Sequence, residues 1–221
     1  MEVDVRGDIV SNDDKWIYDW LEWDATSPGD IKAALMTKPQ GETLTVLINS
    51  GGGSVMAGQE IYSMLHGRDD VEIKVQSLAG SAASVIAMAN TCKISPVGML
   101  MIHNVSMVGA SGDYHDMRKN AEILQQMNAA LAESYIEKTG KSKDEILRLM
   151  DRETWLTANQ ALEMGFVDEI MTDEAPMFTN NLTGMRLTDE IRQKVIAEKA
   201  EQDKKEKLKN EILQDLDLYG I

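Results

Sequence analysis

The sequence has few of the residues that mark a secreted or metal-binding protein. Its 221 residues include one cysteine, Cys92, so no internal disulfide can form and nothing requires an oxidising compartment. The three histidines, His66, His103 and His115, do not have the spacing of zinc ligands. We therefore expect neither a metal nor another cofactor.

The sequence also lacks a long apolar run and a basic leader. It begins MEVDVRGDIV, which is acidic and typical of a strand, so no signal peptide is expected. The longest apolar stretch, around residues 84–89, is far shorter than the roughly 20 residues that cross a bilayer. These features predict a cytoplasmic protein with no membrane partner.

Basic residues are scarce, and this limits the possible partners. The chain has 22 Lys and Arg against 37 Asp and Glu, a formal net charge of −15. Nucleic-acid binding is disfavoured, because phosphate contacts need clustered basic side chains. Residues 186–221 hold 8 basic and 9 acidic groups, so the acidic excess belongs to the rest of the chain.

Segments typical of strands and helices alternate along the first 170 residues. This order predicts an α/β fold with a mainly parallel sheet and right-handed crossovers. Residues 11–28 are expected to form a turn and an aromatic-rich stretch. The expected strands are 3–10, with a bulge at Gly7, and 43–49, 71–78, 92–95, 99–102 and 166–170. The longer expected helices are 55–66 and 112–139.

The composition changes after about residue 175. Residues 176–185 read as a linker, and residues 186–221 as a charged, helical tail. We therefore predict a domain over residues 1–175 followed by this linker and tail. The pattern fits a solvated helix and a partner-binding helix equally well.

A glycine-rich segment, Gly51–Gly53, follows the expected strand at 43–49. Consecutive glycines let the backbone come close to a bound group. The segment lacks the Gly-Lys-Ser/Thr ending of a phosphate-binding loop. A backbone anion hole and a tight strand-to-helix turn both remain compatible with it.

Polar side chains with catalytic potential follow three other segments. Ser84 lies among small residues at the start of a short apolar helix, where a serine is either a nucleophile or a helix cap. Neither Ser81 nor Ser84 has the glycine spacing of the GxSxG elbow. His103 follows a strand, at a position typical of α/β active sites and of structural histidines. Asp151 and Glu153 precede a strand-like segment and are either catalytic or solvated.

Together and in this order, these segments resemble the proteolytic subunit of the Clp protease, a family of serine peptidases. The shared motifs are Ile-Asn-Ser-x-Gly-Gly, Ala-Ala-Ser, Met-Ile-His and Glu-Thr-Trp-Leu-Thr-Ala…Glu-x-Gly-x-Val-Asp, within roughly residues 1–172. The resemblance implies the spiral of βαβ units shared with crotonases, with a long interface helix near 112–139. It also implies a polypeptide substrate and a ring of copies, often seven, in one or two rings.

The resemblance further implies a Ser–His–acid triad and a two-amide oxyanion hole. By position in the motifs, Ser84 matches the nucleophile, His103 the general base and Glu153 the orienting acid, with Asp151 as the alternative acid. The backbone N–H groups of Gly53 and Val85 match the oxyanion donors. A serine needs this arrangement, because it is a poor nucleophile until a histidine takes its proton.

The sequence departs from the usual pattern of the family. Gly51–Gly53 replaces Pro-Gly-Gly, and residues 84–86 are Ser-Val-Ile rather than Ser-Met-Gly. With the added tail, these features resemble the Clp-related head-maturation proteases of phages and prophages, which cut capsid or scaffold proteins without an ATPase. The alternatives are an inactive, Clp-like assembly subunit and an acyl-CoA enzyme of the crotonase class.

Overall fold

The computed structural model of the chain describes residues 1–172 and 188–219. The chain divides into two compact units, Met1–Gly184 and Met185–Ile221. In the described part of the second unit, helix α8 (Asp189–Tyr219) forms where a helical tail is expected. The linker predicted at 176–185 lies outside the described residues, so the domain boundaries stay a prediction. Across the described residues, no helix is both long and apolar enough to cross a membrane.

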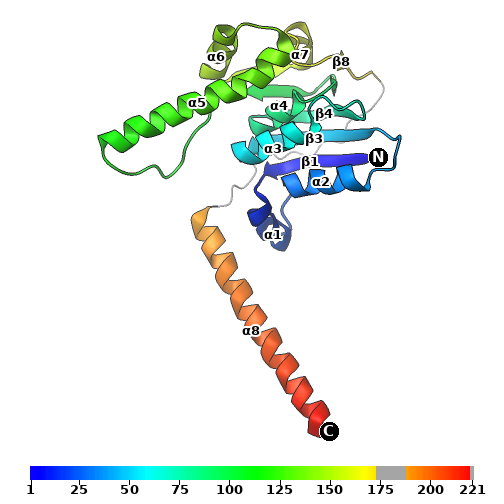
Figure 1. The fold of residues 1–221 in the computed structure, drawn as a ribbon, viewed down its shortest axis with the longest axis vertical. Helices are drawn as coiled ribbons and strands as arrows, with labels where there is room; N and C mark the ends of the chain where they lie inside the picture. The colour runs from blue at the N-terminus through cyan, green and yellow to red at the C-terminus, as the bar shows by residue number, and fades with distance from the viewer. Residues whose placement is uncertain (173–187, 220–221) are drawn as a thin grey trace. The chain divides into compact units, whose positions relative to one another are not determined.

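A mainly parallel sheet of eight strands forms the centre of the first unit (Figure 1). Its order is β2-β1-β3-β4-β5-β8, and β6 pairs with β4 in parallel and with β7 antiparallel. The buried side chains of the sheet are mostly Val, Ile and Leu, as expected for strands covered by other elements. The strands are β1 (Glu2–Ile9), β2 (Ala25–Thr26), β3 (Leu44–Gly53), β4 (Val71–Gly80), β5 (Cys92–Ile94), β6 (Met99–Ile102), β7 (Thr154–Thr157) and β8 (Glu169–Ile170).

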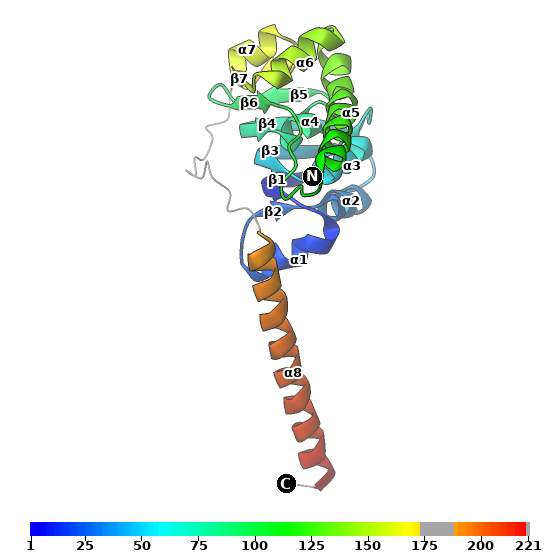
Figure 2. The same ribbon diagram turned by 90° about the vertical axis from the view of Figure 1, so that its left-hand side faces the viewer.

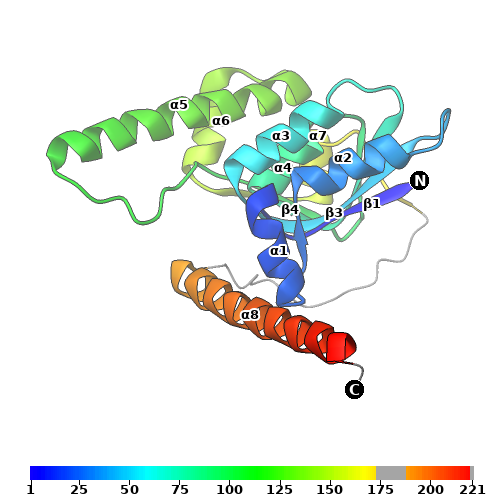
Figure 3. The same ribbon diagram turned by 60° about the horizontal axis from the view of Figure 1, so that its bottom comes forward.

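Helices pack against this sheet, with α2, α3 and α5 on the same side of it in Figure 2. The longest helix of the unit is α5, whose amino-terminal half extends away from the sheet (Figures 1 and 3). It begins after a capping box at Asp113 and ends at Gly140, which has a left-handed φ of 68°. The helices are α1 (Asn12–Trp20), α2 (Pro28–Thr37), α3 (Val55–Leu65), α4 (Ala82–Ala87), α5 (Tyr114–Thr139), α6 (Lys143–Asp151) and α7 (Ala158–Glu163).

The α/β architecture is confirmed, and two local expectations are corrected. Residues 12–20, expected as part of a turn and an aromatic-rich stretch, form α1, which Ser11 caps by accepting from the Asp14 N–H. This helix forms because it buries Ile17 and Tyr18. The second correction concerns β3, which continues through Gly53 instead of ending before the glycines.

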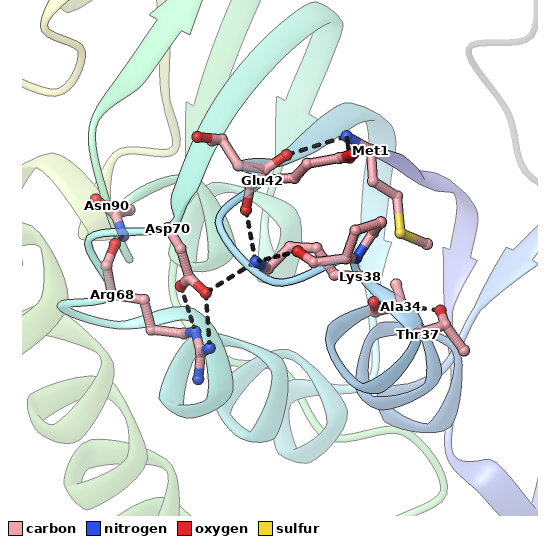
Figure 4. Close-up of polar contacts among 10 residues, drawn as sticks. Met1, Ala34, Thr37, Lys38, Glu42, Arg68, Asp70 and Asn90 are labelled. Carbon is pink, nitrogen blue, oxygen red and sulfur yellow. Dashed lines mark hydrogen bonds and ion pairs between the residues drawn. The ribbon is translucent and has the colours of Figure 1, made fainter.

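A cluster of polar contacts lies at the edge of the sheet where strands β3 and β4 begin (Figure 4). Lys38 follows α2, and its side chain is only 6% exposed. Its Nζ donates to the Glu42 carbonyl at 2.5 Å and lies 3.1 Å from an Asp70 carboxylate oxygen. Arg68 also donates to Asp70, and the hydrogen bonds from Arg68 and then Lys38 lower the pKa of that carboxyl. This cluster joins the end of α2 to the start of β4, away from the edge where the parallel strands end.

Candidate active site

The chemistry-bearing segments meet at the carboxyl-terminal edge of the sheet. Strands β3, β4 and β6 run parallel, so their last residues share one edge, and the antiparallel β7 begins there. Gly53 ends β3, Ser81 follows β4, His103 follows β6 and Glu153 precedes β7. In open α/β sheets ligands bind at this edge, which makes it the candidate site.

Ser81 and His103 form the central contact of the site. The Ser81 Oγ lies 2.7 Å from His103 Nε2, within hydrogen-bond distance. Ser81 has φ 52° and ψ −123°, a left-handed conformation that is unusual for a residue with a Cβ. Such a conformation costs roughly 1–3 kcal/mol and is concentrated at functional positions. Here it forms the sharp turn between β4 and α4, and the serine side chain of this turn meets the histidine.

The prediction that Ser84 is the serine facing the histidine is wrong. Ser84 is completely buried, and its Oγ donates to the Ser81 carbonyl at 2.6 Å and contacts Tyr135 Oη at 2.8 Å. The reason is the length of β4, which continues to Gly80 rather than ending at Leu78. The turn therefore falls on Ser81, and Ser84 lies inside α4 with its side chain in the core.

The two candidate carboxylates occupy different places beside the histidine. The β6–β7 ladder ends with Ile102 opposite Thr154, so His103 directly follows β6 where Glu153 directly precedes β7. Glu153 has a φ of 49° and lies in the turn before the strand, where its N–H donates to the Met150 carbonyl at 3.1 Å. Glu153 Oε1 also accepts from Trp155 Nε1 at 3.1 Å. Asp151 Oδ1 instead accepts from Asn104 Nδ2 at 2.8 Å, so it contacts the residue after the histidine.

One of the two predicted oxyanion donors is already used inside a helix. The Val85 N–H donates to the Ser81 carbonyl at 3.4 Å, as part of α4, so its prediction as a donor is wrong. The change again follows from the three-residue shift of the turn. Gly52 packs directly on this turn, because a Cβ at Gly52 would lie 2.6 Å from Ser81 Cβ and 3.0 Å from the Ala82 nitrogen. Gly53, the other predicted donor, occupies the last position of β3 beside it.

The sequence reasoning missed Ser81 and Tyr135. Gly80, directly before Ser81, was the available signal, since a glycine before a serine suits a sharp strand-to-helix turn. Nothing local marks Tyr135, which lies 51 residues from its partner Ser84 and is 2% exposed.

The described residues hold neither a metal-binding cluster nor an accessible thiol. Within residues 1–172 and 188–219, no three His, Cys, Asp or Glu side chains are grouped to hold a metal ion. Cys92 is fully buried, and burial raises the pKa of its thiol to about 12. A thiol in this state is a poor nucleophile and a poor metal ligand near neutral pH.

Comparison with known proteins identifies the class to which this fold and site belong. The Clp protease family model matches residues 31–174. The ATP-dependent Clp protease proteolytic subunit 2 of Tropheryma whipplei is 32% identical over 137 residues, which are 60% of this chain and 75% of that protein. The proteolytic subunit 1 of Corynebacterium glutamicum is 33% identical over 154 residues, covering 66% of this chain and 74% of that protein. This chain therefore belongs to the Clp protease family.

A solved structure supports the same fold. A mutant form of ClpP1 from Listeria monocytogenes superposes with a TM-score of 0.61 at 24% sequence identity. The superposition covers 78% of this chain and 91% of that chain. The likeness confirms the expected spiral α/β architecture with its mainly parallel sheet.

Proposed function

We propose that the protein is a serine endopeptidase with Ser81 as its nucleophile and His103 as its general base. The observation that carries this proposal is the 2.7 Å contact between Ser81 Oγ and His103 Nε2 on a strained turn. A nucleophile and base within hydrogen-bond distance are the arrangement that activates a serine. Membership of the Clp protease family supports a peptidase reaction on polypeptide substrates.

The proposed reaction has two half-steps. Ser81 Oγ attacks the scissile carbonyl carbon while His103 Nε2 takes the hydroxyl proton, and His103 then gives that proton to the leaving amine. Water next attacks the acyl-serine ester, losing a proton to His103, which returns it to Ser81 Oγ as the acid product leaves. Glu153, which directly precedes β7 where His103 directly follows the paired strand β6, orients the ring and stabilises its charged form.

We propose the Ala82 and Gly53 amides as the oxyanion donors. Ala82 directly follows Ser81, and the residue after a nucleophile on a strand-to-helix turn commonly donates in this way. Ser54 donates its N–H to the Ile9 carbonyl of β1 at 2.7 Å. Successive N–H groups of a strand point to opposite edges, so the Gly53 N–H is directed toward β4, on the side of Ser81.

Within the family, we propose the more specific role of a phage or prophage head-maturation protease acting on capsid or scaffold proteins in the cytoplasm. Two features support it: Gly51 in place of the usual proline, and the α8 helix beyond the family match at 31–174. The protein would assemble as a ring, as expected for its family. It would act without an ATPase, whereas the Tropheryma whipplei and Corynebacterium glutamicum relatives are named as subunits of ATP-dependent proteases.

The experiment that tests the peptidase chemistry uses a fluorophosphonate probe, because it requires no knowledge of the substrate. We expect one adduct per chain, located on Ser81 by tandem mass spectrometry. Ser81→Ala should abolish labelling, and His103→Ala should slow it by several orders of magnitude. Labelling that persists in Ser81→Ala, or an adduct on Ser84, would refute the assignment. Failure of folded wild-type rings to label at all would favour an inactive assembly subunit.

A second assay separates the peptidase from the crotonase alternative and tests the proposed role. Purified protein is incubated with purified phage capsid and scaffold proteins, and the products are sequenced by mass spectrometry. Cleavage that depends on Ser81 and needs no ATP supports the head-maturation role. Turnover of acyl-CoA thioesters without peptide cleavage would support the crotonase-type reading.

A further inference from the structure

A chain of buried hydroxyl groups connects helix α5 to the nucleophile turn. Tyr135 Oη contacts Ser84 Oγ at 2.8 Å, and Ser84 Oγ donates to the Ser81 carbonyl at 2.6 Å. Because a serine hydroxyl has one hydrogen, which Ser84 gives to Ser81, Tyr135 must be the donor to Ser84. Burial also raises the pKa of Tyr135, which keeps this donor protonated. The direction of the chain is therefore Tyr135 to Ser84 to Ser81.

The acceptor at the end of this chain is the carbonyl of the peptide group between Ser81 and Ala82. The Ser81 carbonyl and the Ala82 N–H are two ends of one planar, trans peptide, so they point in opposite directions. Holding the carbonyl toward the core therefore aims the Ala82 N–H away from it. The same peptide follows the left-handed φ of Ser81, so its orientation also sets where Ser81 Oγ lies relative to His103.

We propose that Tyr135 and Ser84 are positioning residues that hold the Ser81–Ala82 peptide in its reactive orientation. The proposal rests on the function proposed above, in which Ser81 attacks and Ala82 donates to the oxyanion. Neither hydroxyl touches the substrate. Their role is to fix a strained turn, whose Ser81 carbonyl also accepts from the Ser84 N–H at 2.9 Å and from the Val85 N–H at 3.4 Å.

The test removes each hydroxyl and measures the rate of fluorophosphonate labelling together with its final stoichiometry. For Tyr135→Phe we expect a rate about fivefold lower, the equivalent of about 1 kcal/mol for one neutral hydrogen bond. For Ser84→Ala we expect a loss of about tenfold, since this change removes the bond to Ser81 itself. Stoichiometry should stay at one adduct per chain. Because both variants break one chain, the double variant should be no slower than Ser84→Ala.

Two variants serve as matched controls. Ser134→Ala removes a buried hydroxyl from the same helix, where Ser134 Oγ donates only to the Leu131 carbonyl of that helix. Tyr18→Phe removes a buried tyrosine hydroxyl that donates to Asp8 Oδ2 at 3.1 Å, far from α4 in the sequence. Both should lose some stability and label at the wild-type rate. With a peptide substrate, Tyr135→Phe should lower kcat and leave KM unchanged.

The outcomes distinguish the positioning role from a structural role and from failure of the proposed function. Reduced stoichiometry with a normal rate for the remaining sites would mean that Tyr135 and Ser84 only support folding, which would overturn the inference. Wild-type labelling rates in Tyr135→Phe and Ser84→Ala would overturn it as well, while leaving Ser81 as the nucleophile. Undiminished labelling in Ser81→Ala would instead remove the proposed function itself.

Discussion

Gly52 offers the sharpest perturbation of the proposed site, because its missing side chain leaves room for the nucleophile turn. Its φ is 105°, and a Cβ there would lie 2.6 Å from Ser81 Cβ and 2.8 Å from the Gly80 carbonyl oxygen. None of these neighbours is the end of a flexible side chain. Gly52→Ala must therefore displace the turn that carries Ser81.

The size of the displacement follows from these distances. Carbon atoms in contact lie at about 3.5–4.0 Å, so the Ser81 Cβ at 2.6 Å must move by about 1 Å. A misplacement of about 1 Å at a reacting group costs on the order of 100-fold in rate. The left-handed backbone adds roughly 1–2 kcal/mol of lost stability in a residue with a Cβ. We expect the labelling rate and kcat/KM of Gly52→Ala to fall by about 100-fold.

The neighbouring glycine provides the control for this prediction. A Cβ at Gly51 would meet no atom within 4 Å, and its φ is not in the left-handed range. Gly51→Ala should therefore keep the wild-type labelling rate and be as stable as the wild type or slightly more so. Labelling of folded Gly52→Ala within threefold of Gly51→Ala would refute the claim that Gly52 sets the position of Ser81.

Three further predictions concern the acid, the buried thiol and the amino-terminal edge. Glu153→Gln should lower kcat for a peptide substrate by at least 100-fold, and Asp151→Asn should lower it by less than tenfold. The reverse order would make Asp151 the acid. Burial raises the pKa of the Cys92 thiol to about 12. Cys92 should therefore not react with a thiol reagent at pH 8 until the protein is unfolded. Rapid reaction of the native protein would contradict the burial of this thiol. Lys38→Met should lower the free energy of unfolding by about 1–2 kcal/mol in urea titrations without changing the labelling rate, because the Glu42 carbonyl and the Asp70 carboxylate each lose the interaction with the Lys38 Nζ. An unchanged urea midpoint would show that water replaces the ammonium group.

Much of the fold could be predicted because its signals are local. The strand at 71–78 and the helix at 112–139 were found from apolar patterning, and they correspond to β4 and α5. Gly7 was predicted as a bulge, and the β1–β3 register does shift there. Helix α1 was missed because its sequence, NDDKWIYDW, is rich in Asp and aromatic residues, which have low intrinsic helix propensity.

The choice of Ser81 as the proposed nucleophile could not be predicted in the same way. Ser81 and Ser84 are three residues apart in a run of small residues, and either could follow a strand that ends near Leu78. What decides between them is the end of β4, where Gly80 pairs with Met101 of β6. That pairing joins segments 21 residues apart, and no local pattern reports it. His103 needed no such information, because its strand ends sharply at the residue before it.

The turn that carries Ser81 is held from two sides. This explains why Gly52, Ser84 and Tyr135, which are far apart in the sequence or in chemistry, all matter to the same turn. From β3, the bare backbone of Gly52 packs against Ser81 and leaves no space for the turn to relax in that direction. From the core, Ser84 and Tyr135 hold the Ser81 carbonyl through two hydrogen bonds. A left-handed serine persists only where its surroundings over-determine it, so each side should matter more when the other is weakened. Combining Gly52→Ala with Tyr135→Phe should therefore lose more than the product of the two single losses, and simple multiplication of the losses would show that the two sides act independently.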